Sequence, residues 1–461
     1  MSIAAAPPIS IRAALIPVTA LLIATAFLFM GHGLQQTLVP LRANEEGFSD
    51  LAIGILGSVY YAGFTAGCLF VPFLILRSGH IRAFAAMVSL LSAAVLAFPL
   101  AVNEPQWLVF RFIVGFCLSG LSVIIESWLN EKSTNQTRGT VMSAYIVVTY
   151  GALSLGQLGV AAQPISGFSL FALCSIVLSL AAIPVALTRA TQPAPIAVVK
   201  FRPRSVVLIA PAAFFGTFVS GIAVGAIFSL GTIYAVGSGF SQTDAALFMS
   251  AFVVGGAIGQ YPFGRLSDFV DRRLVMLGAV SGGGAVCLLL LAGPVLPNSV
   301  ILAMGFAGGA MILPIYSLAC AHAYDWTEHE DLVEVSSALV LFFGIGSTIG
   351  PLIASAAMGM MGPAGLFIVA LSALGLLGAF VFYRMFVRKR PTEEQRGDFD
   401  IYSTSVLGGA VTPEAFGDDE PLMETPAPFP PRSAEPDGTN DAPEAPQMPE
   451  TSQAEVQNRS G

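Results

Sequence analysis

Long apolar stretches separated by short polar turns run through the first 390 residues of the chain. Twelve of these stretches are long enough to cross, as helices, a hydrocarbon core of roughly 30 Å. A bilayer offers no water to backbone N–H and C=O groups, so we predict helices here rather than exposed strands. The predicted spans are residues 13–41, 51–76, 83–102, 107–130, 139–162, 168–188, 205–234, 244–266, 274–294, 299–324, 333–358 and 364–386.

The first span also has the outline of a secretory signal, because an apolar run follows Arg12. Such a signal ends in small residues at a cleavage site, whereas this run leads into the bulky segment 27–30. We therefore expect it to be the first membrane helix.

The twelve spans form two similar sets of six, divided by the long polar loop 189–204. In the fifth span, Ser143-Ala144 and Gly156-Gln157 are matched 194 residues later by Ser337-Ala338 and Gly350-Pro351 of the eleventh. Parallel repeats with a site between them are typical of secondary transporters. The pattern thus favours a transporter.

We expect an all-α membrane protein with twelve transmembrane helices in two pseudo-symmetric six-helix bundles. The first bundle is predicted over residues 1–188 and the second over 205–390, with 189–204 as a cytoplasmic loop between them. Residues 391–461 are acidic and rich in Pro, Ser and Thr, a composition typical of a disordered cytoplasmic tail.

Basic residues gather in the loops that follow even-numbered spans, whereas the opposite loops hold Arg42 as their one base. By the positive-inside rule, this asymmetry predicts that both termini are cytoplasmic. The expected location is the bacterial inner membrane, with many spans in contact with lipid.

Composition excludes a soluble protein, since hydrophobic residues make up 55% of the chain and charged residues 11%. The net charge of −8 comes from the segment after Pro391, which carries 15 of the 29 acidic residues and a net charge of −12. Nothing in the remainder suggests nucleic acid. The five cysteines lie singly in apolar stretches, as small buried side chains do, and no P-loop or cluster of metal ligands appears. We expect no cofactor, no metal and no enzyme activity.

The segment 264–273 concentrates five charges in a turn between the eighth and ninth spans. Gly264, Leu266, Asp268, Arg272 and Arg273 fit the pattern G-x-L-x-D-x-x-G-R-R, which resembles the signature of the major facilitator superfamily of transporters. Asp271 stands where that family usually has Gly.

The resemblance implies that this turn is a conformational latch that contacts the start of the fifth span near Gly139. Asp268 can accept hydrogen bonds from the N–H groups that begin a neighbouring helix. Arg265, Arg272 and Arg273 can pair with nearby carboxylates. The alternative is a basic loop that only fixes topology.

The corresponding turn between the second and third spans keeps Arg77 and Arg82, but Leu76 stands where the family has Asp. The loop between the tenth and eleventh spans is acidic and holds no Lys or Arg. We hypothesise that Arg77 and Arg82 pair with Asp331 or Glu334. Exposed pairs contribute at most about 1 kcal/mol each, so only a network would bias a transport cycle.

Two charged residues lie within the fourth span. Arg111 resembles the family's span-four Arg followed by Gly, which is associated with proton coupling; the alternative is an interfacial anchor. Glu126 is either a protonatable relay or a latch partner of Arg272 or Arg273. Glu126-Ser127, Arg138-Gly139, the run 150–157 and the run 259–266 together resemble the YcaD-like branch of the superfamily.

His32, Gln35 and Gln36 share one helical face, at positions i, i+3 and i+4. Polar groups are expensive in lipid, so this face is predicted to line a central cavity or a helix contact. Weaker candidates for the same role are Tyr145, Tyr150, Gln157 and Gln260. Each has an interhelical hydrogen bond as its alternative.

We expect a monomeric secondary transporter that moves a small solute by alternating access, with protons as the candidate coupling ion. The residues that would carry the proton are His32, Arg111 and Glu126. Both uptake and efflux fit this pattern. The alternatives are an uncoupled facilitator and a membrane sensor or scaffold that acts through the tail.

Overall fold

A computed structural model describes residues 11–134, 136–188, 207, 209–292, 295–328 and 331–387. All the described helices belong to one compact unit within residues 1–417. The predicted loop 189–204 and the predicted tail 391–461 lie outside the described residues. Regular structure within the described ranges is helical throughout, as expected.

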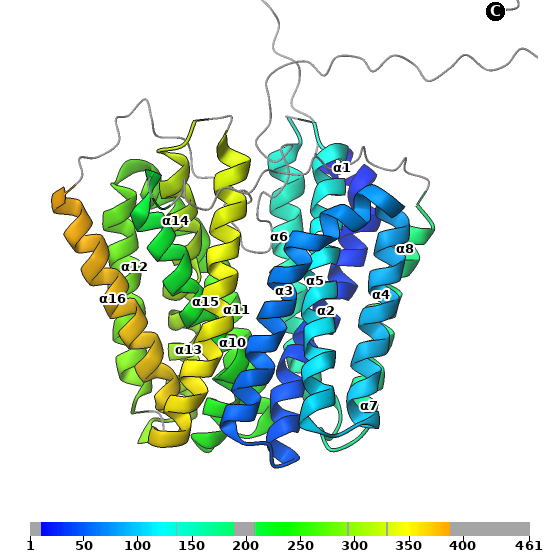
Figure 1. Cartoon of the computed structure of the whole chain (residues 1–461), viewed down its shortest axis with the longest axis horizontal. Helices are drawn as coiled ribbons and strands as arrows, with labels where there is room; N and C mark the ends of the chain where they lie inside the picture. Colours follow the sequence, from blue (N-terminus) through cyan, green and yellow to red (C-terminus); the bar gives the residue numbers. More distant parts are fainter. Residues whose placement is uncertain are drawn as a thin grey trace, which may run out of the picture. The chain divides into compact units, whose positions relative to one another are not determined.

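The helices are α1 (Ile11–Leu15), η1 (Ile16–Val18), α2 (Thr19–Glu45), α3 (Asp50–Ser78), α4 (His80–Ala97), η2 (Phe98–Leu100), α5 (Glu104–Lys132), α6 (Arg138–Leu158), η3 (Gly159–Ala162), α7 (Ser169–Leu180), α8 (Ala182–Ala186), α10 (Pro211–Gly237), α11 (Gln242–Phe269), α12 (Arg272–Leu290), α13 (Asn298–Ile312), α14 (Pro314–Tyr324), α15 (Leu332–Met361) and α16 (Gly365–Val387). Figure 1 shows them running side by side.

Twelve helical stretches in the described residues are long and apolar enough to cross a membrane, which confirms the predicted number of spans. The seventh span differs most from its prediction, because α10 begins at Pro211 rather than at residue 205. A proline fits the first turn of a helix, where its missing N–H needs no partner. The tenth span is broken between α13 and α14, at Pro314.

The two sets of six helices repeat each other in position. α2 and α10 begin 192 residues apart, as do α3 and α11, and α4 and α12. Ser49 caps α3 by accepting a hydrogen bond from the N–H of Ala52, and Ser241 caps α11 in the same way. We call α1–α8 the first half and α10–α16 the second half.

Packing repeats as well, since α2 contacts α6 as α10 contacts α15, and α3 contacts α5 as α11 contacts α13. Gly156 on α6 lies against the backbone oxygen of Met30 on α2, and a Cβ there would overlap that oxygen. In the second half, Gly346 lies in the same way against Phe218. Glycines therefore allow helices to approach each other closely in both halves.

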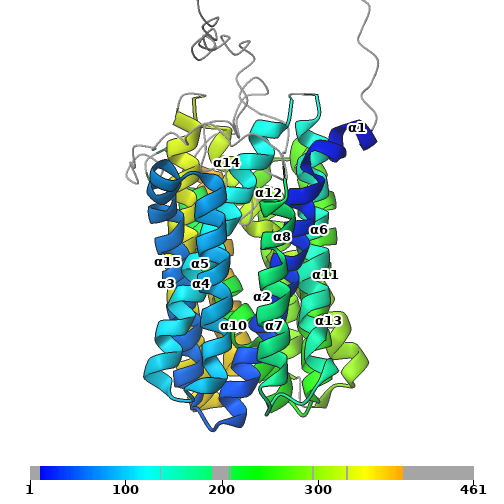
Figure 2. The ribbon, with the colours of Figure 1, turned by 90° about the vertical axis from the view of Figure 1, so that its right-hand side faces the viewer.

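The bundle has an arginine-rich end, which carries Arg77, Arg82, Arg272 and Arg273, and an opposite end, which carries Arg42. Helix α1 and the last turn of α16 both lie toward the arginine-rich end (Figure 1). Figure 2 shows α1 bent away from the direction of α2 at that end.

The halves contact each other through α3 with α15, α6 with α11 and α2 with α10. Near the opposite end, Gly54 packs closely against Ser355, and Ser250 donates a hydrogen bond to the carbonyl oxygen of Ser154 at 3.3 Å. Nearer the centre, Gly344 packs against Thr65. These contacts thus extend from the opposite end to the middle of the bundle.

Candidate functional site

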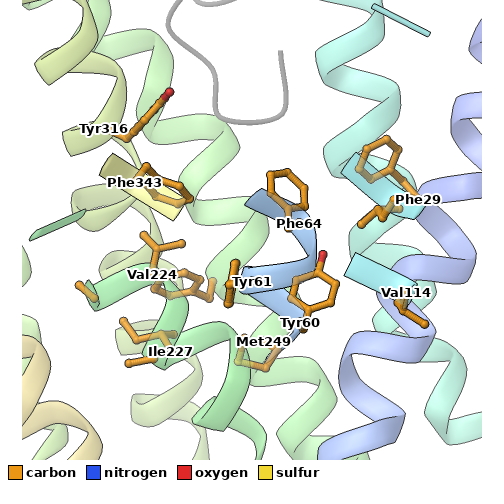
Figure 3. Close-up of a cluster of buried hydrophobic side chains, with 14 of the residues drawn as sticks. Phe29, Tyr60, Tyr61, Phe64, Val114, Val224, Ile227, Met249, Tyr316 and Phe343 are labelled. Atoms are coloured by element: carbon orange, nitrogen blue, oxygen red, sulfur yellow. The ribbon is translucent and has the colours of Figure 1, made fainter. Parts of the chain in front are cut away.

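A cavity of about 780 Å³, counting the space at its mouth, lies between the two halves. Aromatic side chains from both halves dominate its walls: Phe29, Tyr60, Tyr61, Phe64, Tyr150, Phe228, Tyr316 and Phe343. Figure 3 shows the three α3 rings between Phe29 and the residues of the second half. None of the described residues that line the cavity is Asp, Glu, Lys or Arg.

Only part of the polar face predicted on the first span lies at this cavity. His32 and Gln36 line the wall, whereas Gln35 does not. The His32 ring stacks on Tyr60 with ring centroids 5.9 Å apart. Gln36 donates from Nε2 to the carbonyl oxygen of Phe228, 3.2 Å away, while its Oε1 is buried and has no hydrogen-bond partner among the described residues.

Two of the weaker candidates meet across the interface between the halves. Gln260 of α11 donates from Nε2 to the hydroxyl of Tyr150 on α6 at 3.3 Å, and the Ser317 hydroxyl donates to Gln260 Oε1 at 3.4 Å. All three side chains line the cavity. Gln260 is therefore held in place by one partner from each half.

Gln157 and Tyr145 do not line this cavity. Gln157 is fully buried, and neither of its amide atoms has a hydrogen-bond partner in the part of the chain that the structure describes. The hydroxyl of Tyr145 donates a hydrogen bond to Oε1 of Glu126 at 2.8 Å, and both side chains are buried. The partner of Glu126 in this structure is thus a hydroxyl rather than an arginine.

Arg111 lies behind the wall of the cavity. Its guanidinium carbon is 4.6 Å from the centre of the Tyr60 ring, within the range of a cation–π contact. Its Nε donates to the carbonyl oxygen of Leu56 at 3.4 Å, and the side chain is only 1% exposed. Arg111 therefore contacts the lining residue Tyr60, which in turn stacks on His32.

The charged turn at the arginine-rich end forms buried ion pairs within the second half. Arg272 Nε lies 2.9 Å from Oδ2 of Asp325, which follows α14. Arg273 Nη2 lies 2.9 Å from Oδ2 of Asp271, and its Nη1 donates to the carbonyl oxygen of Arg384 on α16. The two arginines thus connect the start of α12 to α14 and α16.

Asp271, which stands where the family usually has Gly, has a defined role. Its carboxylate caps α12 by accepting a hydrogen bond from the N–H of Arg273 at 3.0 Å. Burial by itself raises the pKa of Asp271. The hydrogen bonds and charge of Arg273, with a smaller effect from His322, lower this pKa by more, so that it lies below its ordinary value of 3.8. The carboxylate is therefore held in its charged form.

The remaining latch candidates lie at the same end. Gly264 and Asp268 belong to the last turns of α11, and Arg265 lies 5.8 Å from the centre of the Tyr261 ring. Arg77 and Arg82 are exposed. In the part of the chain that the structure describes, neither of them forms an ion pair with Asp331 or Glu334, so that pairing stays a prediction.

Sequence reasoning missed most of the aromatic wall. Phe64, Phe228 and Phe343 lie in apolar runs, where a ring facing the cavity and a ring facing lipid have the same surroundings in sequence. A usable signal was the adjacent pair Tyr60-Tyr61, because two hydroxyl groups in mid-span need polar surroundings.

The family described as the Major Facilitator Superfamily matches the sequence over residues 21–230 and 213–431. A relative from Enterobacter sp. (strain 638), named "Uncharacterized MFS-type transporter Ent638_1421", is 29% identical over 383 residues, which cover 81% of this chain and 96% of the relative. The "Uncharacterized MFS-type transporter YcaD" of Shigella flexneri is 28% identical over 380 residues, 81% of this chain and 95% of that protein.

Solved structures share the fold. The nucleoside transporter NupG superposes with a TM-score of 0.66 at 14% identity, over 81% of this chain and all of that one. A bacterial homologue of the human lysosomal transporter Spinster, in an inward-facing and occupied conformation, gives a TM-score of 0.64 at 16% identity, over 82% of this chain and 97% of that one. At these identities the likeness concerns the fold alone.

Proposed function

Because the chain belongs to the Major Facilitator Superfamily, a family of transporters rather than enzymes, we propose that it moves a small solute across the bacterial inner membrane by secondary active transport with alternating access. The observation that carries the proposal is the central cavity between two repeated halves, with walls from both. A site at the interface of repeats is reached from either side when the halves rock against each other.

We infer that the conformation in this structure opens toward the cytoplasm. The positive-inside rule assigns the arginine-rich end to the cytoplasm. The contacts of Gly54 with Ser355 and of Ser250 with Ser154 hold the halves together toward the opposite, periplasmic end. In the outward-open state these contacts separate and the cytoplasmic ends approach.

The latch residues would act in that second state. Arg77 and Arg82 are exposed here, and on closure of the cytoplasmic end they would meet Asp331 or Glu334. The buried pairs of Arg272 with Asp325 and of Arg273 with Asp271 would keep the charged turn rigid, so that it moves as one piece with the second half.

Proton coupling would use the first half. A buried ionisable residue in a membrane span is expensive and marks a functional site by default. Glu126 is buried with the hydroxyl of Tyr145 as its partner, and Arg111 contacts the cavity residue Tyr60. One observation favours an uncoupled facilitator instead: no carboxylate is present among the described residues that line the cavity.

Flux measurements on reconstituted protein test these functions. A thermal-shift screen against metabolites and drugs first identifies a solute, and its uptake into proteoliposomes is then measured with and without a pH gradient. A coupled transporter concentrates the solute only when the gradient is present, whereas a facilitator only equilibrates it. Deleting residues 391–461 should leave the flux of a transporter unchanged, whereas a scaffold that acts through the tail should lose its function.

A further inference from the structure

Aromatic side chains from both halves line the central cavity, and such a lining suits a ring system. Tyr61 and Phe64 of α3 line the cavity from the first half, and Phe228 and Phe343 line it from the second. Aromatic rings stack offset or edge to face on other rings, and such pairs gain energy beyond the area that they bury. A planar aromatic solute therefore matches both halves at once.

Gln36, which lines this cavity, has one hydrogen-bond acceptor that no group of the described residues uses. The side chain is 3% exposed, and its orientation is fixed because Nε2 donates to the carbonyl oxygen of Phe228. Within the described ranges, its Oε1 is buried without a hydrogen-bond partner. A buried acceptor is costly unless a donor reaches it, so the missing donor points to a ligand.

The charges around the cavity disfavour an ionic solute. A cation finds no carboxylate among the described lining residues, and the guanidinium of Arg111 lies just behind Tyr60. An anion finds no Lys or Arg among those lining residues, because the Tyr60 ring lies between the cavity and Arg111. The His32 imidazole on the wall is stacked on that same ring. Either ion would lose its hydration shell without gaining an ion pair.

Resting on the transport function proposed above, we propose that the solute is an uncharged, planar aromatic molecule that donates a hydrogen bond to Oε1 of Gln36. The rings of both halves hold its faces, and the Gln36 carbonyl selects for an N–H or O–H on its edge. Gln260, fixed by Tyr150 and Ser317, bounds the site from the second half.

Matched aromatic amides test this selectivity by binding. The full-length protein in detergent is titrated with nicotinamide, which is neutral, nicotinate, which is an anion, and 1-methylnicotinamide, which is a cation. A second, larger series contains the corresponding neutral amide, carboxylate anion and N-methylated cation of quinoline-3-carboxylic acid. We expect saturable binding of at least one neutral amide, with both of its charged counterparts at least about tenfold weaker. Equal or tighter binding of a charged counterpart, or no saturable binding by either neutral amide, would overturn the proposal.

Substitution of the acceptor gives a second measurement. Gln36→Leu should weaken binding of the neutral amide about tenfold or more while the protein stays folded by thermal melting. Gln163→Leu, the same change at an exposed loop position, is the control and should bind as the unaltered protein does. Unchanged affinity in Gln36→Leu would contradict the assigned role of Gln36.

Counterflow separates the solute class from the transport function. Liposomes loaded with the bound amide should accumulate labelled amide when the protein is present. Binding with the expected selectivity but without counterflow would leave the solute class standing and refute transport. Counterflow of a charged analogue at the rate of the neutral one would refute the solute class and leave transport standing.

Discussion

Gln36 of α2 donates a hydrogen bond to the backbone carbonyl of Phe228 on α10, and these two residues occupy corresponding positions in the two repeats, 192 residues apart. The repeat axis therefore passes close to this contact. Since one position is an amide and the other a ring, the cavity is symmetric in its backbone and asymmetric in its chemistry.

Close packing of α6 on α2 depends on Gly156, so Gly156→Ala should destabilise the protein. The new methyl would overlap the backbone oxygen of Met30, and overpacking of this kind typically costs about 1–3 kcal/mol. Thermal unfolding in detergent measures the loss. Gly151→Ala on the same helix is the control, because a Cβ there meets nothing within 4 Å. Equal melting temperatures for the two variants would contradict the packing argument.

The buried pair of Arg272 and Asp325 should be sensitive to loss of either partner. Asp325→Asn leaves the guanidinium without its anion, and breaking a buried ion pair costs about 3–5 kcal/mol. Equilibrium unfolding in mixed micelles should show this loss. As a control, Glu46→Gln breaks the surface pair with Arg42 and should cost less than about 1 kcal/mol. Similar losses in both variants would exclude a special role for the buried pair.

Asp271 should make stability depend on acid. Because its pKa is lowered in the folded protein, its contribution is complete above the ordinary pKa of 3.8 and is lost as pH falls through the lower, folded value. Asp271→Asn should therefore melt below the unaltered protein near neutral pH, and the difference should narrow below about pH 4. A difference independent of pH would argue against the charged form of Asp271.

Glu126→Gln tests proton coupling without removing the acceptor for Tyr145. If Glu126 carries the proton, this variant should still exchange solute in counterflow, but an imposed pH gradient should no longer drive accumulation. Tyr145→Phe, which leaves a buried carboxyl without its donor, should lower the stability by about 1–3 kcal/mol. Normal gradient-driven accumulation by Glu126→Gln would assign the proton to another residue.

Arg77 and Arg82 should affect rate rather than stability in the present conformation. Replacing both with Gln removes no ion pair that the described residues form, so the melting temperature should stay unchanged. Transport should slow about fivefold, the equivalent of about 1 kcal/mol, because the closed cytoplasmic end loses its pairs with Asp331 or Glu334. A normal rate at equal expression would remove these pairs from the cycle.

Hydropathy and helix periodicity predicted the spans because the bilayer itself imposes their length and their helical form. The same periodicity placed His32 and Gln36 on one face, and the structure brings both to the cavity. Gln35, one position away, turns from it and is buried elsewhere. Which of two adjacent residues on a helix faces the cavity depends on how that helix packs against the neighbouring helices. The local sequence does not contain this information.

By itself, the sequence determined the twelve helices, their division into two repeats and the end of the bundle where basic charge collects, since these depend on composition and spacing along the chain. Tertiary structure alone decided which rings face the cavity, that Glu126 pairs with Tyr145, and that Arg272 pairs with Asp325. The physical reason is that these partners lie on different helices, and only packing in three dimensions sets the distance between them.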